Sequence, residues 1–276
     1  MSGGDGVFTY RHGIAAVQII FFALSLLFAV YFRYSRRNGW FCIGVFSIFR
    51  IVGAGCMLAT ISSDSKGAWT GVFVCESFGM VLIIYLIIEF LLRINKVFPT
   101  VHDRWFWYPQ VITWADIGLT IGGFTAASRS DHGLEPTGYT QASFGLFTAL
   151  YLIVVYIFWC LWSMRGTFSH DEMVLIRCAA VCLPLLAVRT AYSLIFQITG
   201  DMTWNAVKGN PTAYLVLTFL AESAIIYASI LAILKISPRP GKMKHNDKWA
   251  QVRQQAYPLM DSERRSRVRE PAQYPV

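Results

Sequence analysis

Long apolar runs alternate with short polar connections along the first 236 residues of the chain. Seven of these runs approach or exceed the roughly 20 residues that an α-helix needs to cross the hydrocarbon core of a bilayer. We therefore predict an all-α polytopic membrane protein, a bundle of seven transmembrane helices in one domain at residues 12–236. The predicted spans are 12–32, 40–61, 68–92, 105–127, 142–162, 174–199 and 212–236.

The composition agrees with this class. Of the 276 residues, 55% are hydrophobic and only 14% are charged, whereas a soluble domain carries about 25% charged residues. Residues 1–11 form a short N-terminus. Residues 237–276 are rich in Pro, Arg and Gln and poor in aliphatic residues, which predicts a disordered basic tail.

The distribution of Lys and Arg predicts the orientation. The connections after the first, third and fifth spans carry more Lys and Arg than the others, so the N-terminus is expected to be lumenal or outside and the C-terminus cytoplasmic. The basic tail, in a chain of net charge +8, then lies near the anionic leaflet, and we expect the bilayer rather than a nucleic acid as its partner.

Ionisable residues inside the spans are the strongest functional signal. A charge at bilayer depth costs roughly 2.5–3.5 kcal/mol on insertion scales, so such residues need a partner or a role. Helix rise places five of them in the middle or outer half of the bilayer. They are Arg50, Glu76, Asp116, Arg189 and Glu222.

If these five side chains converge, three acids meet two arginines. Arginine stays charged, so two acids can pair and the third is expected to hold its proton in a dry site. Asp116 is central in its span and shares a helical face with Thr113 and Thr120. A protonated buried acid is a general acid. The alternative is that the arginine–acid pairs only tie helices together.

Aromatic residues near these charges are candidates for lining an apolar pocket that tolerates cations. Tyr192 follows Arg189 by three residues on the same face, so it is a candidate supporting residue. Packing against lipid and neighbouring helices is the alternative for each aromatic. The substrate-binding candidates are Phe78, Trp114, Tyr151, Tyr156 and Trp159.

Several site motifs are absent from the sequence. The last span has no lysine before Lys235, where a retinal Schiff base needs one. There is no Asp-rich diphosphate motif, no HExxH, no GxSxG, no Walker loop and no histidine cluster. We therefore expect no metal and no cofactor, and an enzyme of this sequence would use acid–base chemistry.

Three runs carry a family resemblance: FSIFRIVGAGCMLATIS in the second span, VRTAYSLIF in the sixth and FLAESAIIYASILAIL in the seventh. They resemble a fungal family of seven-span integral membrane proteins over residues 7–236. The architecture is also similar to the membrane-bound terpene cyclases of fungal meroterpenoid pathways. Those enzymes use buried acids, without a metal, to open the terminal epoxide of a prenylated aromatic, so the resemblance implies similar chemistry here.

Two functions follow as hypotheses. The first is a terpene cyclase, an intramolecular lyase or isomerase of secondary metabolism. It would take a lipophilic farnesylated aromatic from the bilayer and protonate its terminal epoxide with Asp116, Glu76 or Glu222 as general acid. Arg50 and Arg189 would fix the other two acids. The expected location is the endoplasmic reticulum membrane. The alternative is a non-enzymatic seven-span receptor, sensor or lipid-translocating protein, since the chain also resembles such fungal proteins in length and span number.

Overall fold

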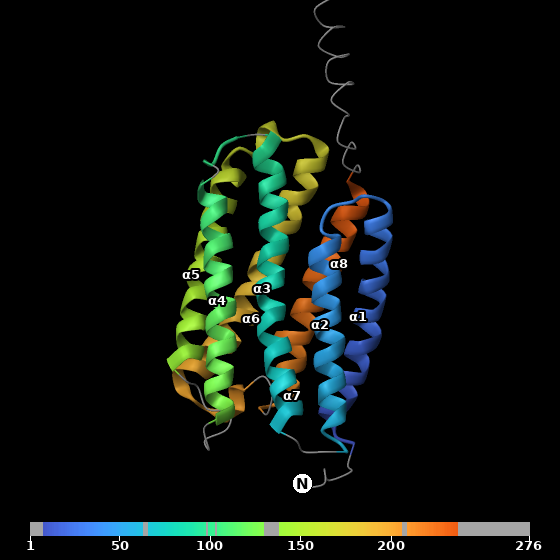
Figure 1. Ribbon diagram of the computed structural model, residues 1–276. Coiled ribbons are helices and arrows are strands. Elements are labelled where there is room, and N and C mark those ends of the chain that lie inside the picture. Colours follow the sequence, from blue (N-terminus) through green and yellow to red (C-terminus); the bar gives the residue numbers. More distant parts are fainter. Residues whose placement is uncertain are drawn as a thin grey trace, which may run out of the picture. The chain divides into compact units, whose positions relative to one another are not determined.

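The computed structural model describes residues 8–62, 66–97, 99–102, 104–129, 138–205 and 209–236 (Figure 1). Every regular element in these ranges is a helix, so the all-α prediction is confirmed for them. The expected tail at 237–276 and most of the expected N-terminal segment lie outside the described residues.

Seven long helical segments form the bundle in the part of the chain that the structure describes. Helices α1 to α6 lie at Tyr10–Tyr34, Trp40–Ala59, Lys66–Val97, Arg104–Arg129, Gly138–Ser163 and His170–Thr199. The last segment runs through α7 (Pro211–Tyr214), η3 (Leu215–Leu220) and α8 (Ala221–Lys235), and η3 has π-helical hydrogen bonding. Short 3-10 turns, η1 (Arg165–Thr167) and η2 (Met202–Trp204), lie in the connections before and after α6.

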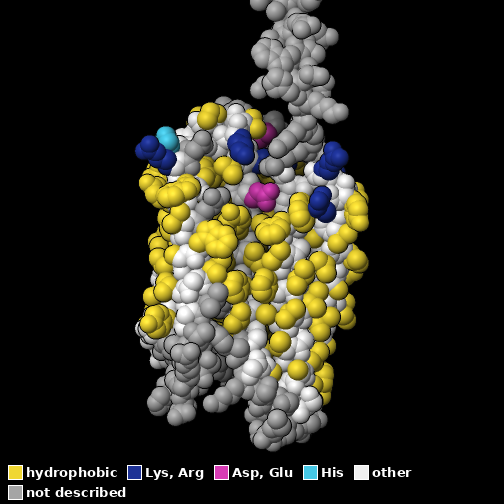
Figure 2. Space-filling model, in the orientation of Figure 1, with side chains coloured by type: hydrophobic (Ala, Val, Ile, Leu, Met, Phe, Trp, Pro, Cys, Tyr) yellow, Lys and Arg dark blue, Asp and Glu magenta, His cyan; other side chains and the backbone are white. Residues whose placement is uncertain are grey.

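Six of these segments are long and apolar enough to cross a membrane, which indicates a multi-pass membrane protein. Helix α4 is as long as α5 but is not among the six, so the seventh span stays a prediction. Hydrophobic side chains cover the middle of the described surface in Figure 2. Lys and Arg side chains gather at the upper end, where α1 connects to α2.

Several helices extend beyond the predicted spans. Helix α3 continues to Val97, α5 begins at Gly138 and α6 begins at His170. Hydropathy marks only the apolar part of a helix, whereas backbone hydrogen bonding continues through polar residues. Ser169 is the N-cap of α6, and its hydroxyl donates to the Glu172 carboxylate while accepting no backbone N–H.

Close helix contacts fix the centre of the bundle. Helices α2 and α3 pack together, α3 packs on α6, and α6 packs on α8, while α4 pairs with α5 beside α3 (Figure 1). A Cβ at Gly53 of α2 would lie 2.9 Å from the Cβ of Cys75 in α3, so this position needs glycine. Gly55, two residues further along α2, has no atom within 4 Å of an added Cβ, so no close helix contact requires glycine there.

The side chain of Asn95 holds the connection between α3 and α4. Its Nδ2 donates to the Val101 carbonyl at 2.8 Å, and its Oδ1 accepts from the Thr100 and Val101 N–H groups at 3.2 and 2.9 Å. Asn95 is buried. These bonds therefore satisfy the N–H and C=O groups of Val101, a buried residue that belongs to no helix, together with the N–H of Thr100.

We predict that Asn95→Ala lowers the free energy of unfolding by about 2 kcal/mol, because it leaves buried backbone groups without partners. Denaturant unfolding of the purified protein in detergent measures this change. The control is Ser62→Ala, which removes an exposed hydroxyl and is expected to stay within about 0.5 kcal/mol. Equal stability of the two variants would contradict this role of Asn95.

Candidate functional site

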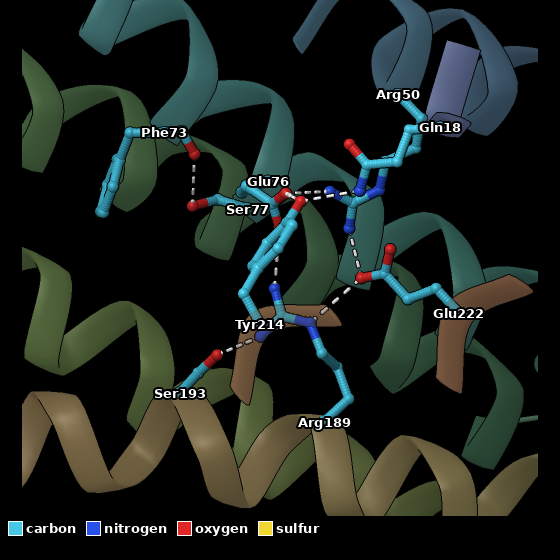
Figure 3. Close-up of polar contacts among 9 residues, drawn as sticks. All are labelled: Gln18, Arg50, Phe73, Glu76, Ser77, Arg189, Ser193, Tyr214 and Glu222. Carbon is cyan, nitrogen blue, oxygen red and sulfur yellow. Dashed lines mark hydrogen bonds and ion pairs between the residues drawn. The ribbon is translucent and has the colours of Figure 1, made fainter. Parts of the chain in front are cut away.

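Four charged side chains from four helices meet inside the bundle (Figure 3). They are Arg50 of α2, Glu76 of α3, Arg189 of α6 and Glu222 of α8, and we call them the ion tetrad. Their exposed fractions are 3%, 7%, 1% and 0%. The tetrad therefore lies away from bulk solvent, near the middle of α2 and in the first half of α3.

Each acid of the tetrad contacts both arginines. Arg50 Nη1 lies 2.5 Å from Glu76 Oε1, and Arg50 Nη2 donates to Glu222 Oε1. Arg189 Nη2 donates to Glu76 Oε2 at 3.0 Å, and Arg189 Nε donates to Glu222 Oε1 at 3.1 Å. Two positive and two negative charges balance, which offsets the several kcal/mol that burying each ion costs.

Uncharged side chains extend this network to α1 and α7. The Tyr214 hydroxyl donates to Glu76 Oε1, and Gln18 Nε2 donates to the Tyr214 oxygen at 2.9 Å. Arg189 Nη1 donates to the Ser193 hydroxyl (Figure 3). Sequence reasoning missed Gln18, Tyr214 and Ser193. Helical spacing signals two of them, because Ser193 follows Arg189 by four residues and Tyr214 precedes Glu222 by eight.

Local backbone features position the tetrad. A Cβ at Gly79 would lie 2.9 Å from Arg50 Nη2, so glycine lets the guanidinium lie against α3. Glu222 is the second residue after the π-helical η3. Such π-bulges change the register of the residues that follow and occur frequently at functional sites. Pro184, which is expected to kink α6, lies five residues before Arg189.

Asp116 lies apart from the tetrad, so the expected convergence of all five charges is wrong for this residue. Its buried carboxylate accepts a hydrogen bond from Ser143 of α5, because α4 pairs with α5. Thr113 is buried beside it and donates to the Pro109 carbonyl at 2.7 Å, whereas the Thr120 side chain lies outside the described residues. Within the described residues the tetrad has two acids and two arginines, and no surplus acid.

The candidate aromatic residues are scattered. Trp114, Tyr156 and Trp159 are 74%, 51% and 68% exposed on α4 and α5. Phe78 stacks on Phe49 with ring centroids 5.2 Å apart. The Tyr151 hydroxyl donates to the Leu183 carbonyl at 3.2 Å, which joins α5 to α6.

Tyr192 is buried, and its ring lies 6.0 Å from that of Trp204. Two small cavities lie beside the tetrad, and none of the five substrate-binding candidates is among their lining residues. The exposed aromatics instead face outward, as lipid-facing residues of a membrane protein do.

Two small cavities flank Glu76. The first leaves about 20 Å³ for the centres of water molecules, and Arg11, Gln18, Arg50 and Tyr214 are among its lining residues. The second leaves about 30 Å³, and its lining includes Arg189 with residues from α5, α6 and the connection after α6. Roughly 10–15 Å³ by this measure holds one water. Both cavities therefore suit water molecules rather than a prenylated substrate.

A family model described as a domain of unknown function, DUF7702, matches residues 8–237. The chain belongs to the DUF7702 family. No curated protein and no solved structure matches it. The matched range contains every described helix, the ion tetrad and Asp116, so the DUF7702 domain comprises the described bundle with the tetrad and the Asp116 site.

We predict that Arg189→Met destabilises this DUF7702 protein by about 3–5 kcal/mol, because one arginine then faces two buried carboxylates. The double variant Arg189→Met/Glu222→Met restores charge balance and is expected to recover most of the loss. Unfolding in detergent measures both.

The control is Asp201→Asn in the exposed connection after α6. There the Thr203 N–H donates to the carboxylate at 2.9 Å and lowers the pKa of Asp201. The asparagine oxygen can still accept this bond, so wild-type stability is expected. A double variant less stable than Arg189→Met alone would contradict the charge-balance account.

Proposed function

We propose that this DUF7702 protein is a non-enzymatic seven-span membrane receptor or sensor in which the ion tetrad is the switch. The observation that supports it most is the sharing of both tetrad acids by both arginines. Glu76 and Glu222 are then engaged with cations and are poor proton donors to a substrate. They form ion pairs between helices, and a conformational change can break these pairs.

The surroundings of the tetrad support movement. Small cavities on both sides of Glu76 give its neighbours room to rearrange, whereas a close-packed core resists it. The helical segments with Arg189 and Glu222 also contain Pro184 and η3, where helices bend. A ligand that binds an opened state more tightly would shift the population toward that state.

The predicted topology gives this switch a direction. Arg11 lines the first cavity and Asn205 the second, and both residues lie at the end of the bundle where α1 begins and α6 finishes. If α4 also crosses the membrane, the chain has seven spans. With the N-terminus lumenal or outside, both cavities then lie toward the lumenal side of the bundle. The signal would then pass to the cytoplasmic ends of α6 and α8, in the endoplasmic reticulum or a later membrane.

Hydrogen–deuterium exchange tests the switch. Glu222→Gln removes one charge from the tetrad with little change in shape. We expect amides of 186–197 and 215–225 to exchange at least about tenfold faster, while the amides of α5 exchange as in the wild type. Asp201→Asn is the control and is expected to change neither region. Uniformly faster exchange in all helices would show a static tie and overturn the switch.

A terpene cyclase remains a second candidate because Asp116 is a buried carboxyl whose hydrogen-bond partner is a neutral serine. A carboxyl without a neighbouring cation is easier to keep protonated than one in the tetrad. Under this candidate, Asp116 donates its proton to the epoxide oxygen of a prenylated aromatic that enters from the bilayer. The carbocation then cyclises and loses a proton, and Ser143 orients the acid.

Microsomes that contain the protein test this candidate with an epoxidised farnesyl phenol as substrate. The cyclase predicts a cyclised isomer of equal mass that Asp116→Asn reduces by about 100-fold or more, with wild-type product from Asp201→Asn. Chromatography with mass spectrometry separates the isomers. Absence of product from the wild type, or full activity of Asp116→Asn, would end the candidate.

A further inference from the structure

The first turn of α1 contains a buried histidine, His12, whose ring is hydrogen-bonded on both sides. Thr9 is the N-cap of the helix, and its backbone N–H donates to His12 Nδ1 at 3.0 Å. The Thr9 hydroxyl lies 2.8 Å from the same nitrogen. His12 occupies the third helical position, where a capping box ordinarily has Glu or Gln to accept this N–H. The cap of α1 therefore depends on a side chain that titrates near neutral pH.

These bonds indicate which ring nitrogen carries the hydrogen. Nδ1 accepts from a backbone N–H, so it has no proton of its own. His12 Nε2 lies 3.3 Å from Thr60 Oγ1, directly after α2, and the Thr60 hydroxyl donates to the Met57 carbonyl at 2.7 Å. The Thr60 oxygen is then left to accept from Nε2–H. His12 is therefore neutral, in the Nε2–H form, when α1 begins and packs on α2 as it does here.

Protonation of His12 is incompatible with this arrangement. An imidazolium carries hydrogens on both nitrogens, so Nδ1–H would point at the Thr9 N–H in place of accepting from it. Arg11 precedes His12 and acts on it with a charge of the same sign. Because the contact needs the neutral ring, its stabilisation is present above the pH at which histidine ordinarily titrates, about 6.5, and is lost as the pH falls.

Within the part of the chain that the structure describes, no carboxylate acts on the His12 ring. The neighbouring helices bring two thiols, a phenol and the ion tetrad to this end of the bundle. They are Cys56 of α2, Cys75 of α3, Tyr214 of α7 and the tetrad itself. Both tetrad acids are already engaged by two arginines. An imidazolium would therefore lose its hydrogen-bond acceptor role without gaining an ion pair.

The first turns of α1 are connected to the tetrad through Arg11 and Gln18. Arg11 Nη2 donates to the Gly209 carbonyl at 2.8 Å, and its guanidinium lies 5.6 Å from the centre of the Tyr214 ring. Gln18 Nε2 donates to the Tyr214 hydroxyl, which in turn donates to Glu76 (Figure 3). Release of the start of α1 would therefore remove partners from Tyr214, which binds a tetrad acid.

We propose that His12 is a proton-binding site and that the proton is a ligand of this sensor. Proton binding opens the cap of α1, breaks its contact with the end of α2 and loosens the tetrad through Tyr214. The site lies at the end of the bundle where α1 begins, so the stimulus is acid on the N-terminal side of the membrane. This assignment rests on the proposed switch and names what acts on it.

Hydrogen–deuterium exchange of the full chain in detergent, at about pH 7.5 and about pH 5, tests the site with the proton as probe. His12→Gln keeps an acceptor at the third helical position and removes the titration. At the lower pH we expect amides of 10–18 and 215–225 to exchange at least about tenfold faster in the wild type than in His12→Gln. At the higher pH the two proteins are expected to exchange alike. Comparing them at one pH cancels the effect of pH on intrinsic exchange.

His102→Gln is the matched control. His102 is exposed in the connection between α3 and α4, at the opposite end of α3 from Cys75, and its Nδ1 also accepts a backbone N–H, from Arg104 at 3.2 Å. This variant is expected to respond to pH as the wild type does. NMR of ring-labelled histidine gives a second readout, in which the signals lost in His12→Gln are those of a neutral Nε2–H ring at about pH 7.5.

Equal exchange of the wild type and His12→Gln at the lower pH would overturn the site, as would an Nδ1–H or charged ring at the higher pH. Faster exchange confined to 10–18 would show a cap that does not act on the tetrad and would also overturn the proposal. None of these outcomes depends on Glu222→Gln, which tests the switch at a single pH. Failure of the proton as ligand and failure of the switch are therefore distinguishable.

Discussion

Neutralisation of buried charge is the constraint on which this bundle depends. Arg50 and Arg189 cannot lose their charge, and both are almost completely buried. Glu76 and Glu222 supply the matching charges, and each carboxylate contacts both guanidiniums. Four helices are thereby held in one register. A shift of any of them would leave an uncompensated ion in a medium of low dielectric constant.

The separation of Asp116 from this tetrad divides the functional hypotheses. The charges of the tetrad are balanced and its side chains are hydrogen-bonded, which suits a set of ion pairs that ligand binding separates. Asp116 has a serine as its partner and keeps the chemistry of an isolated acid. Acid catalysis would thus belong to the α4–α5 pair, and conformational switching to α2, α3, α6 and α8. The two ideas concern different parts of the same DUF7702 domain.

Much of the fold could be predicted from the sequence because apolar runs report helix positions directly. Helix rise also predicts that Arg50, Glu76, Arg189 and Glu222 lie at similar heights in their helices, and these four side chains do meet. Hydropathy carries no information on which helices are neighbours. The expectation that Asp116 joins the two arginines is therefore wrong. Gln18 lies 196 residues from Tyr214 in sequence, and nothing local signals that contact. The bond from Arg37 Nη1 to the Ile233 carbonyl likewise joins residues 196 apart in sequence.

An experimental density map of the protein in a lipid nanodisc, at a resolution that shows side chains, tests the central claim most directly. The account predicts that the carboxylates of Glu76 and Glu222 each lie within hydrogen-bonding distance of both the Arg50 and the Arg189 guanidinium, with Asp116 beside Ser143. Density that places Asp116 among the arginines, or Glu222 away from them, would contradict it.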